Sequence, residues 1–344
     1  MTAEILTCDK GTVSDVRDPA GDHLQALIKP PPYAGVTALA PLAETAREYM
    51  AGAKAAATKR AYSADWRDFR SWCSLRAVPS LPAAPQTVVL YLTELSATRK
   101  VSTLVRRLSA ISQAHQVAGF ESPAQSAAAR TLMAGIRRAK GTAPVVKAPT
   151  LIEDIRAMLA TLPAGLLGTR DRALLLTGFA GAFRRSELVA LDHADLEFNA
   201  RGLVVTLRRS KTDQEGHGRK VALPYGSTFE TCPVRSTQAW LEESGITDGP
   251  LFRAINRHGQ MQSGRLSGVA VARIVKRCIG AAGLDPSNYS GHSLRSGFAT
   301  TAAIAGASER AIMNQTGHQS TKMVRRYIRD GNLFRDNAAA KLGL

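Results

Sequence analysis

One tyrosine near the end of the chain lies among residues suited to chemistry on a phosphate group. Residues 317–329 read GHQSTKMVRRYIR, so basic side chains surround Tyr327. At helical spacing Met323, Val324 and Ile328 share a face with this tyrosine, which is also the pattern of an ordinary core residue. A functional role for Tyr327 therefore depends on which donors the fold brings to its hydroxyl group.

A histidine and an arginine occur earlier, in YSGHSLRSGFATTAA at residues 289–303. Ser290 can cap a helix whose first turn contains His292, with Arg295 three residues further on the same face. An imidazole and a guanidinium at a helix N-terminus favour binding of a phosphate. His292 alone would equally suit a structural histidine. The segment differs from a GxSxG nucleophile elbow at its last glycine and follows no strand, which argues against a hydrolase.

A second histidine is predicted to lie close to the tyrosine. Residues 308–329 divide into two short helices, because Ser308 and Ser320 are suitable N-caps and Gly317 is a suitable helix end. His318 then lies in the turn just before the helix that carries Tyr327. This placement makes His318 a possible proton donor near the tyrosine.

Together, GHSLR, TGHQS and VRRYIR resemble the C-terminal signature of the tyrosine recombinases, also called the phage integrase family, and most closely its Cre-type members. The histidine, arginine, histidine and tyrosine have a similar order and spacing across residues 289–329. The resemblance extends over roughly residues 39–344 and is weaker in the N-terminal part. At position 318, Cre-type enzymes have tryptophan and many other members have histidine.

The resemblance implies two further site residues upstream. The family's first arginine matches Arg184 in FRRSEL, where Glu187 is the implied partner that orients it. The family's lysine lies in a β-hairpin turn and matches Lys211 in RRSKTD. Without the other motifs, Arg184 would be interpreted as an ordinary helix arginine and Lys211 as a solvated charge.

The resemblance also implies a reaction. Family members cleave and rejoin DNA through a covalent 3′-phosphotyrosine, without metal, ATP or another cofactor. The arginines would hold the phosphate oxygens, the histidines would add hydrogen bonds and shuttle the tyrosine's proton, and the lysine would protonate the departing 5′-oxygen. The implied catalytic residues are the nucleophile Tyr327 with Arg184, Lys211, His292, Arg295 and His318, supported by Glu187.

The composition independently favours a nucleic-acid partner. The chain has 45 Lys and Arg residues against 28 Asp and Glu residues, a formal net charge of +17. Such an excess favours a polyanionic partner, with a merely basic surface as the alternative. No basic amphipathic anchor, long apolar span or signal-peptide pattern is evident, which predicts a cytoplasmic, nucleoid-associated protein without a membrane partner. Four scattered cysteines predict reduced packing residues and no metal site.

The length of 344 residues predicts two domains. We expect a flexible leader at residues 1–35, a helical core-binding domain at 36–140, a linker at 141–149 and a catalytic domain at 150–330. The C-terminal segment at 331–344 would form a helix that docks into a neighbouring protomer, as the family resemblance implies, or packs on its own domain.

The periodicity predicts a mainly α fold with a small antiparallel β-sheet in the catalytic domain. β-branched runs on both sides of KTDQEGHG predict a hairpin, and residues 195–198 can add a third strand. The rest of the catalytic domain is predicted to be helical. Thr150, with Glu153 three residues later, is the expected cap of its first helix.

The DNA-binding surface is predicted from charge. Between residues 97 and 140, Glu121 is the single acid among many basic residues, which favours a DNA-facing surface over a solvated one. The two domains would hold opposite faces of a duplex as a clamp, mostly through phosphates. The candidate DNA-binding residues are Lys59, Arg60, Arg106, Arg107, Arg137, Arg138, Lys140, Arg208 and Arg209.

Three functions fit these observations to different degrees. The first is a site-specific recombinase that acts as a tetramer on two double-stranded DNA sites. A type IB topoisomerase would use a similar constellation as a monomer, but the helical first domain and the Cre-type motifs argue against it. A DNA-binding regulator without catalysis would have no need for all six reactive side chains.

Overall fold

The computed structural model describes residues 41–42, 45–46, 48–49, 53–143, 146–208, 210, 213, 216, 218–331 and 342. The predicted leader at 1–35 lies outside these residues, as do Arg209, Lys211 and most of the C-terminal segment. The chain divides into two compact units, Met1–Pro144 and Val145–Leu344. The division falls within the predicted linker.

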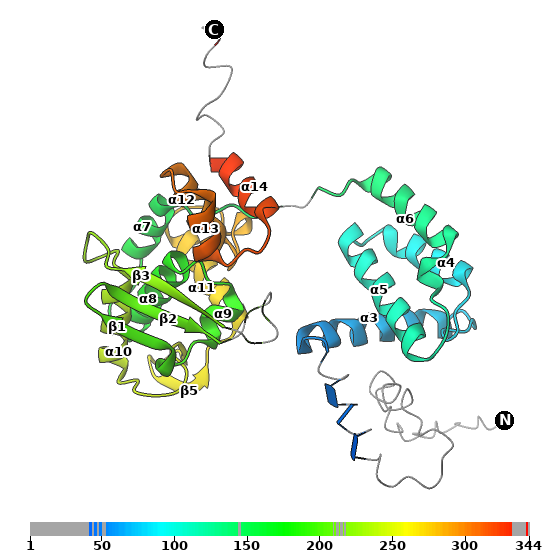
Figure 1. Ribbon diagram of the computed structural model, residues 1–344, viewed down its shortest axis with the longest axis horizontal. Helices are drawn as coiled ribbons and strands as arrows, with labels where there is room; N and C mark the ends of the chain where they lie inside the picture. Colours follow the sequence, from blue (N-terminus) through cyan, green and yellow to red (C-terminus); the bar gives the residue numbers. More distant parts are fainter. Residues whose placement is uncertain are drawn as a thin grey trace, which may run out of the picture. The chain divides into compact units, whose positions relative to one another are not determined.

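The first unit is helical (Figure 1). Its apolar core is formed by side chains such as Phe69, Tyr91, Leu104 and Ile111, all 0% exposed. Helix α3 packs against α5, and α4 packs against α6. The described helices are α3 (Ala56–Ser74), α4 (Pro85–Ser96), α5 (Val101–Val117), the 3₁₀ helix η2 (Pro123–Gln125) and α6 (Ala127–Lys140).

A buried polar cluster joins the helices of the first unit and corrects one prediction. Arg107 is only 8% exposed, and its guanidinium donates to Asp68 and to the Tyr91 hydroxyl. Arg106 donates to both carboxylate oxygens of Asp65, at 2.7 and 3.0 Å. Arg107 therefore cannot offer the exposed phosphate contact expected of it, because two acids on α3 draw it into the core.

The second unit is built around a buried helix. Ten of the residues of α8 are buried, on all sides of the helix, as an interior helix requires. It contacts α7, α9, α10 and α12. The described helices are α7 (Ile152–Ala160), α8 (Leu166–Ala180), α9 (Arg185–Ala190), η3 (His193–Asp195), α10 (Pro233–Ser244), α11 (Gly268–Ala281), η4 (Pro286–Asn288), α12 (Ser293–Ile304), α13 (Glu309–Thr316) and α14 (Thr321–Gly331).

The predicted sheet is present in the second unit. Strands β1 (Leu196–Asn199), β2 (Gly202–Leu207) and β3 (Arg219–Pro224) form an antiparallel sheet in the order β1-β2-β3. Val205 is the central register position, opposite both Leu196 and Val221. The β-branched runs thus pair as their alternation indicates, with one face on the core.

A second sheet corrects the expectation of a helical remainder. Strands β4 (Arg253–Ile255) and β5 (Met261–Arg265) pair antiparallel. Their turn is closed by a hydrogen bond from the Asn256 amide to the Gln260 carbonyl at 2.9 Å, and Gly259 adopts the positive φ that the turn requires. Three residues on one strand and a polar partner give too little alternation to be recognised from sequence.

The end of the linker packs on the second unit. The Thr150 amide donates to the Ser293 carbonyl at 3.0 Å, and the Ala148 amide donates to the Asn288 carbonyl at 2.8 Å. Leu151, and not Thr150, is the N-cap of α7, with Asp154 accepting from the Leu151 amide at 2.9 Å. The predicted cap is wrong because Thr150 is still extended and paired with the start of α12.

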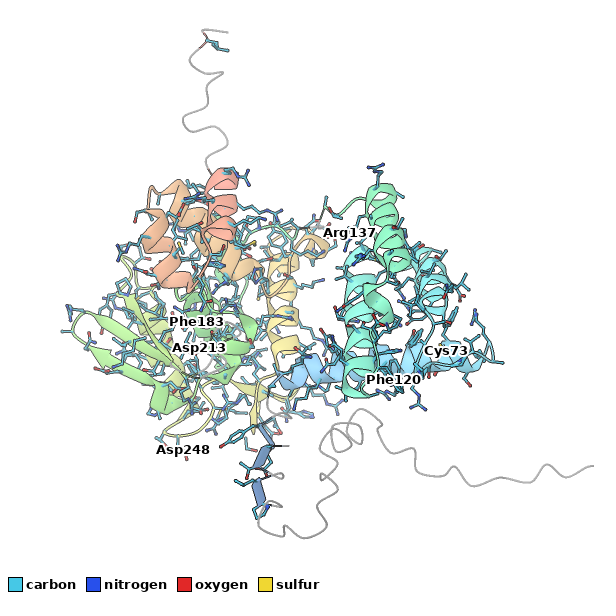
Figure 2. The ribbon with its side chains drawn as sticks, turned by 45° about the vertical axis from the view of Figure 1, so that its right-hand side comes forward. Cys73, Phe120, Arg137, Phe183, Asp213 and Asp248 are labelled. Carbon is cyan, nitrogen blue, oxygen red and sulfur yellow. The ribbon has the colours of Figure 1, made fainter. Side chains whose placement is uncertain are left out.

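The two units have separate hydrophobic cores, marked in Figure 2 by Cys73 in the first and Phe183 in the second. Cys73, Cys232 and Cys278 are free and buried, as predicted for packing residues. Within the described part of the chain, no helix has the length and apolar character needed to cross a bilayer.

Candidate active site

Five of the six predicted catalytic side chains come from three neighbouring segments of the second unit. Arg184 is the N-cap of α9. His292 is the N-cap of α12, and Arg295 lies in that helix's first turn. His318 lies between α13 and α14, and Tyr327 is in α14. The helices α12, α13 and α14 contact one another, which brings the last four of these residues together (Figure 1). Arg184 is close enough for its charge to act on Arg295.

Arg184 is oriented by its predicted partner. Its backbone amide donates to Glu187 Oε2 at 2.8 Å, and its Nη1 donates to Glu187 Oε1 at 2.5 Å. Glu187 is 2% exposed and occupies the first turn of α9, where a carboxylate is favoured by the helix dipole. One carboxylate thus holds both the main chain and the guanidinium of Arg184.

Arg295 is a buried cation. It is 1% exposed, and its Nη1 donates to the Ala182 carbonyl at 2.7 Å, in the turn between α8 and α9. Burial, and next the charge of Arg184, lower the pKa of Arg295 to about 10, so it remains protonated at neutral pH. Among the described residues it takes part in no ion pair. A buried charge without a counter-ion favours binding of an anion.

His318 is held in one neutral tautomer. The Thr316 hydroxyl donates to the Ile312 carbonyl at 2.7 Å, so Nδ1 of His318, 2.7 Å from that hydroxyl, carries a proton and donates. Nε2 then accepts from Arg295 Nη2 at 3.3 Å. Burial, followed by the charge of Arg295, lowers the pKa of His318 to about 4. In this state Nε2 is an acceptor, in contrast to the proton donor hypothesised from sequence.

Tyr327 lies with its ring in a small apolar cluster and its hydroxyl near the histidines. It is 7% exposed and packs with Val324, while Met323 is 44% exposed and does not share the buried face as predicted. Tyr327 Oη lies 3.5 Å from His292 Nε2. The ring centroid lies 6.2 Å from that of His318. The cluster therefore fixes the phenol in the site.

The start of α12 differs slightly from the prediction. Ser290 is not the cap of the helix, because His292 occupies the N-cap position and the helix begins at Ser293. Ser290 Oγ accepts the His292 amide at 3.2 Å, and Ser293 Oγ accepts the Ser290 amide at 2.9 Å. This turn leaves the His292 side chain exposed, so it can meet both the tyrosine and a ligand from solvent.

A third arginine, Arg219, was missed by the sequence reasoning. It is the first residue of β3 and donates to the carbonyls of Asn314 at 3.3 Å and Gln315 at 3.1 Å. Burial lowers its pKa, and nearby charges of Glu187 and Arg184 act on it in opposite directions. The glycine of TGHQS is the sequence signal that points to a close contact here, since Gly317 adopts a φ of +65° beside the Arg219 guanidinium.

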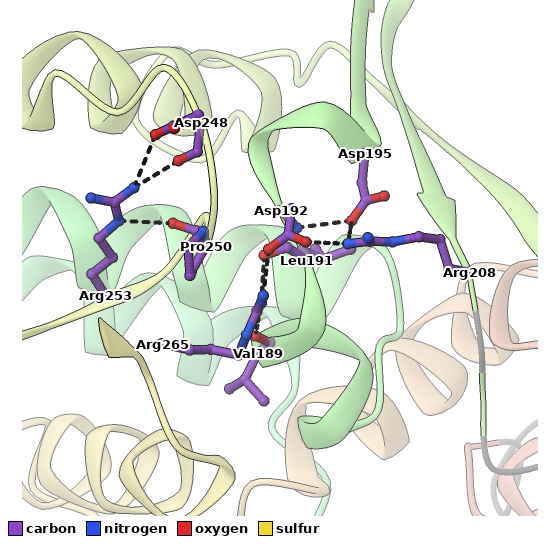
Figure 3. A network of polar contacts seen from close by, with 9 residues as sticks. All are labelled: Val189, Leu191, Asp192, Asp195, Arg208, Asp248, Pro250, Arg253 and Arg265. Atoms are coloured by element: carbon purple, nitrogen blue, oxygen red, sulfur yellow. Dashed lines mark hydrogen bonds and ion pairs between the residues drawn. The ribbon is translucent and has the colours of Figure 1, made fainter. Parts of the chain in front are cut away.

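The hairpin that carries Lys211 is anchored at its base, although Lys211 itself lies outside the described residues. Figure 3 shows the network: Arg208 Nη2 donates to Asp195 at 2.8 Å and also to Asp192. Arg265 donates to Asp192 and to the Leu191 carbonyl, the latter at 3.0 Å. The Arg208 side chain is 59% exposed, yet its guanidinium forms ion pairs with two carboxylates and thereby holds the end of β2 in place.

The other candidate DNA-binding residues lie on exposed helix surfaces of the first unit. Arg106, although half exposed, is engaged with Asp65. Arg137, labelled in Figure 2, lies in the last turn of α6, where basic side chains also complement the helix dipole. The exposed positions are Lys59, Arg60, Arg106, Arg137, Arg138 and Lys140.

Comparisons with known proteins agree with this arrangement. The model of the phage integrase family matches residues 151–332. An integrase/recombinase xerD homologue from Selenomonas ruminantium is 45% identical over 302 residues, which cover 86% of this chain and 88% of that protein. The recombinase cre of Escherichia phage P1 is 26% identical over 287 residues, covering 77% of this chain and 81% of that one.

Solved structures share the fold. The integrase of transposon Tn1549, in complex with transposon right end DNA, matches with a TM-score of 0.60 at 16% identity, covering 87% of this chain and 96% of that one. A lambda integrase dimer bound to a COC′ core site matches with a TM-score of 0.57 at 17% identity, covering 86% and 96%. By the family match and the close relative, the chain belongs to the phage integrase family of site-specific tyrosine recombinases.

Proposed function

We propose that this recombinase cleaves and rejoins DNA through a covalent 3′-phosphotyrosine formed by Tyr327, and that it acts as a tetramer on two sites. The observation that carries the proposal is an excess of positive charge beside a tyrosine. Arg184, Arg219 and Arg295 influence one another electrostatically, and Glu187 is the carboxylate among them. A phosphodiester would supply the missing negative charge.

In the proposed reaction, Tyr327 Oη attacks the phosphorus while the bond to the 5′-oxygen breaks. His292 Nε2 lies 3.5 Å from the phenol oxygen and is assigned the role of accepting its proton. Lys211 is assigned the proton donated to the departing 5′-oxygen, as the family resemblance implies. One phosphodiester bond is replaced by another, so strand exchange requires no external energy source.

The arginines would stabilise the charge that develops on the phosphoryl oxygens. Arg295 is held from behind by the Ala182 carbonyl, and Arg184 by Glu187, so both forks are oriented before DNA arrives. A bound phosphate would also offset the charge of Arg295 that lowers the pKa of His318. That pKa would then rise, and a protonated Nε2 could donate to a phosphate oxygen.

DNA is the proposed partner, held as in the complexes of the Tn1549 and lambda integrases. In this proposal the first unit is the core-binding domain, and the two units clamp opposite faces of a duplex. Exposed cations on α3 and α6 support a phosphate-binding surface of this kind. The C-terminal segment at 331–344 would reach a neighbouring protomer and link assembly to activity.

The proposal is tested with a plasmid that carries two copies of the DNA flanking the gene. The purified full-length chain is incubated with it in EDTA and without ATP, and the products are analysed by gel electrophoresis and sequencing. We expect recombinant junctions at one defined position. Relaxed circles without junctions would support a type IB topoisomerase instead, and binding without any strand breakage would support a regulator.

A further inference from the structure

Arg219 makes a set of contacts outside the proposed reaction. It begins β3, directly after the hairpin loop, and its guanidinium donates to three consecutive carbonyls. Nη1 lies 3.3 Å from the Asn314 oxygen and 3.1 Å from the Gln315 oxygen, and Nη2 lies 3.5 Å from the Thr316 oxygen. These are the last residues of α13.

The contact has a clear electrostatic basis. The final carbonyls of a helix have no partner within the helix and carry partial negative charge. A planar guanidinium can serve several of them at once, which a lysine ammonium does less well. Arg219 therefore caps α13 from a different element, the sheet.

The end of α13 is shaped to admit this side chain. Gly317 adopts a left-handed φ of +65° as the C-cap of α13. A Cβ atom at this position would lie 2.8 Å from Nε and 2.9 Å from Cζ of Arg219. The glycine therefore provides both the turn and the space for the guanidinium.

The capped turn leads directly to His318. Thr316, whose carbonyl accepts from Arg219, has its hydroxyl 2.7 Å from Nδ1 of His318. Gln315 adds a second link to the sheet, since its Nε2 donates to the Ala222 carbonyl of β3 at 3.2 Å, and it also donates to the Ala180 carbonyl at the end of α8 at 2.8 Å. Two side chains, Arg219 and Gln315, thus hold the turn before His318 to β3.

We propose that Arg219 is a positioning residue for His318, which ties the turn before α14 to the hairpin that carries Lys211. The proposal rests on the proposed strand-cleavage function, in which both residues act at one phosphate. Arg219 is not assigned a phosphate contact, because its Nη1 and Nη2 groups donate to the carbonyls of α13. Arg219 keeps the His318 imidazole in its position beside the Arg295 guanidinium and the Tyr327 phenol.

The first test is a double-mutant cycle in the full-length chain. The substrate is a nicked duplex built on the sequence recovered from the wild-type covalent adduct, and the rate of adduct formation is measured at saturating DNA. We expect Arg219→Met to slow the reaction by about 10- to 100-fold, as a small misplacement of a reacting group does. In a His318→Ala background the same change should have less than about a twofold effect.

A matched control lies next in the strand. Lys220 is exposed, contacts Glu197 at 3.7 Å and does not reach α13, so Lys220→Met removes the same charge from the same strand. This variant should react within about twofold of the wild type. Arg219→Lys, which keeps the charge, should give an intermediate rate. If the fold-decreases in rate of the Arg219→Met and His318→Ala single variants multiplied in the double variant, the two residues would act independently and the proposal would be overturned.

The second test needs no DNA and therefore stays informative if the proposed function fails. Long-range ¹H–¹⁵N correlation spectra of histidine-labelled protein report the tautomer and titration of His318, assigned through the His318→Ala variant. We expect the Nδ1–H tautomer to be lost, and titration to move to higher pH, in Arg219→Met but not in Lys220→Met. The charged or titratable groups that face His318 are Arg184, Arg219, His292, Arg295 and Tyr327.

The outcomes separate the two proposals. Unchanged His318 spectra in folded Arg219→Met and Arg219→Lys would overturn the positioning role, whatever the activity. A wild type that forms no adduct, together with a His318 tautomer that depends on Arg219, would overturn the proposed function alone.

Discussion

Each unit of the molecule contains an arginine beside a buried tyrosine, and the two clusters differ in their charge balance. In the first unit Arg107 meets Tyr91 and Asp68, and Asp65 lies 3.8 Å from its Nε. In the second unit Arg295 is near Tyr327, with the cations Arg184 and Arg219 and the carboxylate of Glu187 as further charged neighbours. The charges of the first cluster balance one another, whereas the second cluster has positive charge left for an anion.

The pKa directions express the same difference. Burial would lower the pKa of Arg107, but its hydrogen bonds to Asp68 and Tyr91 raise it above the ordinary value. For Arg295, burial and the charge of Arg184 act together and lower the pKa. An arginine beside a tyrosine is therefore structural where carboxylates balance its charge, and is a candidate for phosphate chemistry where cations outnumber the carboxylates.

The largest expected effect sharpens this comparison. Arg295→Gln should slow covalent adduct formation by about 10²–10³-fold, the loss typical of one preorganised donor to developing charge. It should not lower the free energy of unfolding, because it removes a buried cation without a counter-ion. The rate of adduct formation at saturating DNA tests the first expectation, and urea unfolding of the same sample tests the second. A marked loss of stability with normal kinetics would make Arg295 structural.

The reciprocal change in the first unit should affect stability. Arg107→Met leaves Asp68 and the Tyr91 hydroxyl without their shared donor, while Asp65 keeps Arg106, and should lower the local stability by about 1–3 kcal/mol. Hydrogen exchange of peptides from α3, α4 and α5 in the full-length chain measures this loss. Arg138→Met, at an exposed site, is the control and should change stability by no more than about 0.5 kcal/mol. Equal protection in both variants would refute the structural role of Arg107.

The residues nearest in sequence were the most predictable. Ser308 caps α13, Gly317 ends it, and Glu187 holds Arg184, and each of these contacts spans only three or four residues along the chain. The hairpin strands were also clear from their β-branched alternation. Local capping and periodicity therefore placed most of the site on its elements.

The missed features depend on residues distant in sequence. Arg107 is buried by Asp68, 39 residues earlier. Thr150 pairs with Ser293 instead of capping α7. Arg219 reaches carbonyls 95–97 residues later, and no backbone carbonyl leaves a mark in the sequence. Tertiary contacts of this kind override local preference.

A glycine-to-alanine pair extends the comparison to packing. Gly297 in α12 faces Thr150, the first residue after the linker, and a Cβ there would lie 1.8 Å from the Thr150 carbonyl oxygen. Gly297→Ala should therefore destabilise the second unit by about 1–3 kcal/mol. Gly135 in α6 has open space, so Gly135→Ala should stabilise the first unit by up to about 1 kcal/mol. Thermal unfolding of the two variants measures whether each change raises or lowers stability. A stabilised Gly297→Ala variant would contradict the close contact between Gly297 and Thr150.

The smallest expected effect concerns pH and one histidine in each unit. His115 accepts the Ala83 amide at 2.9 Å, and burial lowers its pKa, as it does for His318. Because the folded pKa of His318, about 4, is below the unfolded value of about 6.5, its contribution is complete above pH 6.5 and is lost as pH falls toward 4.

Urea unfolding at pH 7 and pH 5 measures this dependence. His318→Gln should reduce the loss of stability between these two pH values by at most about 1 kcal/mol, since the group is partly solvated. His115→Gln should change the slope in the same direction. A variant at either histidine that steepens the pH dependence would show that the imidazole is protonated in the folded chain.

The most direct test of the central claim is covalent trapping with a matched pair of tyrosine variants. Wild type, Tyr327→Phe and Tyr91→Phe are incubated with the DNA flanking the gene, stopped with detergent and examined for protein–DNA adducts that resist denaturation. We predict an adduct with the wild type and with folded Tyr91→Phe, and none with Tyr327→Phe. An adduct that persists in Tyr327→Phe, or that is absent from the wild type even on nicked DNA that blocks religation, would contradict the assignment of Tyr327 as the nucleophile.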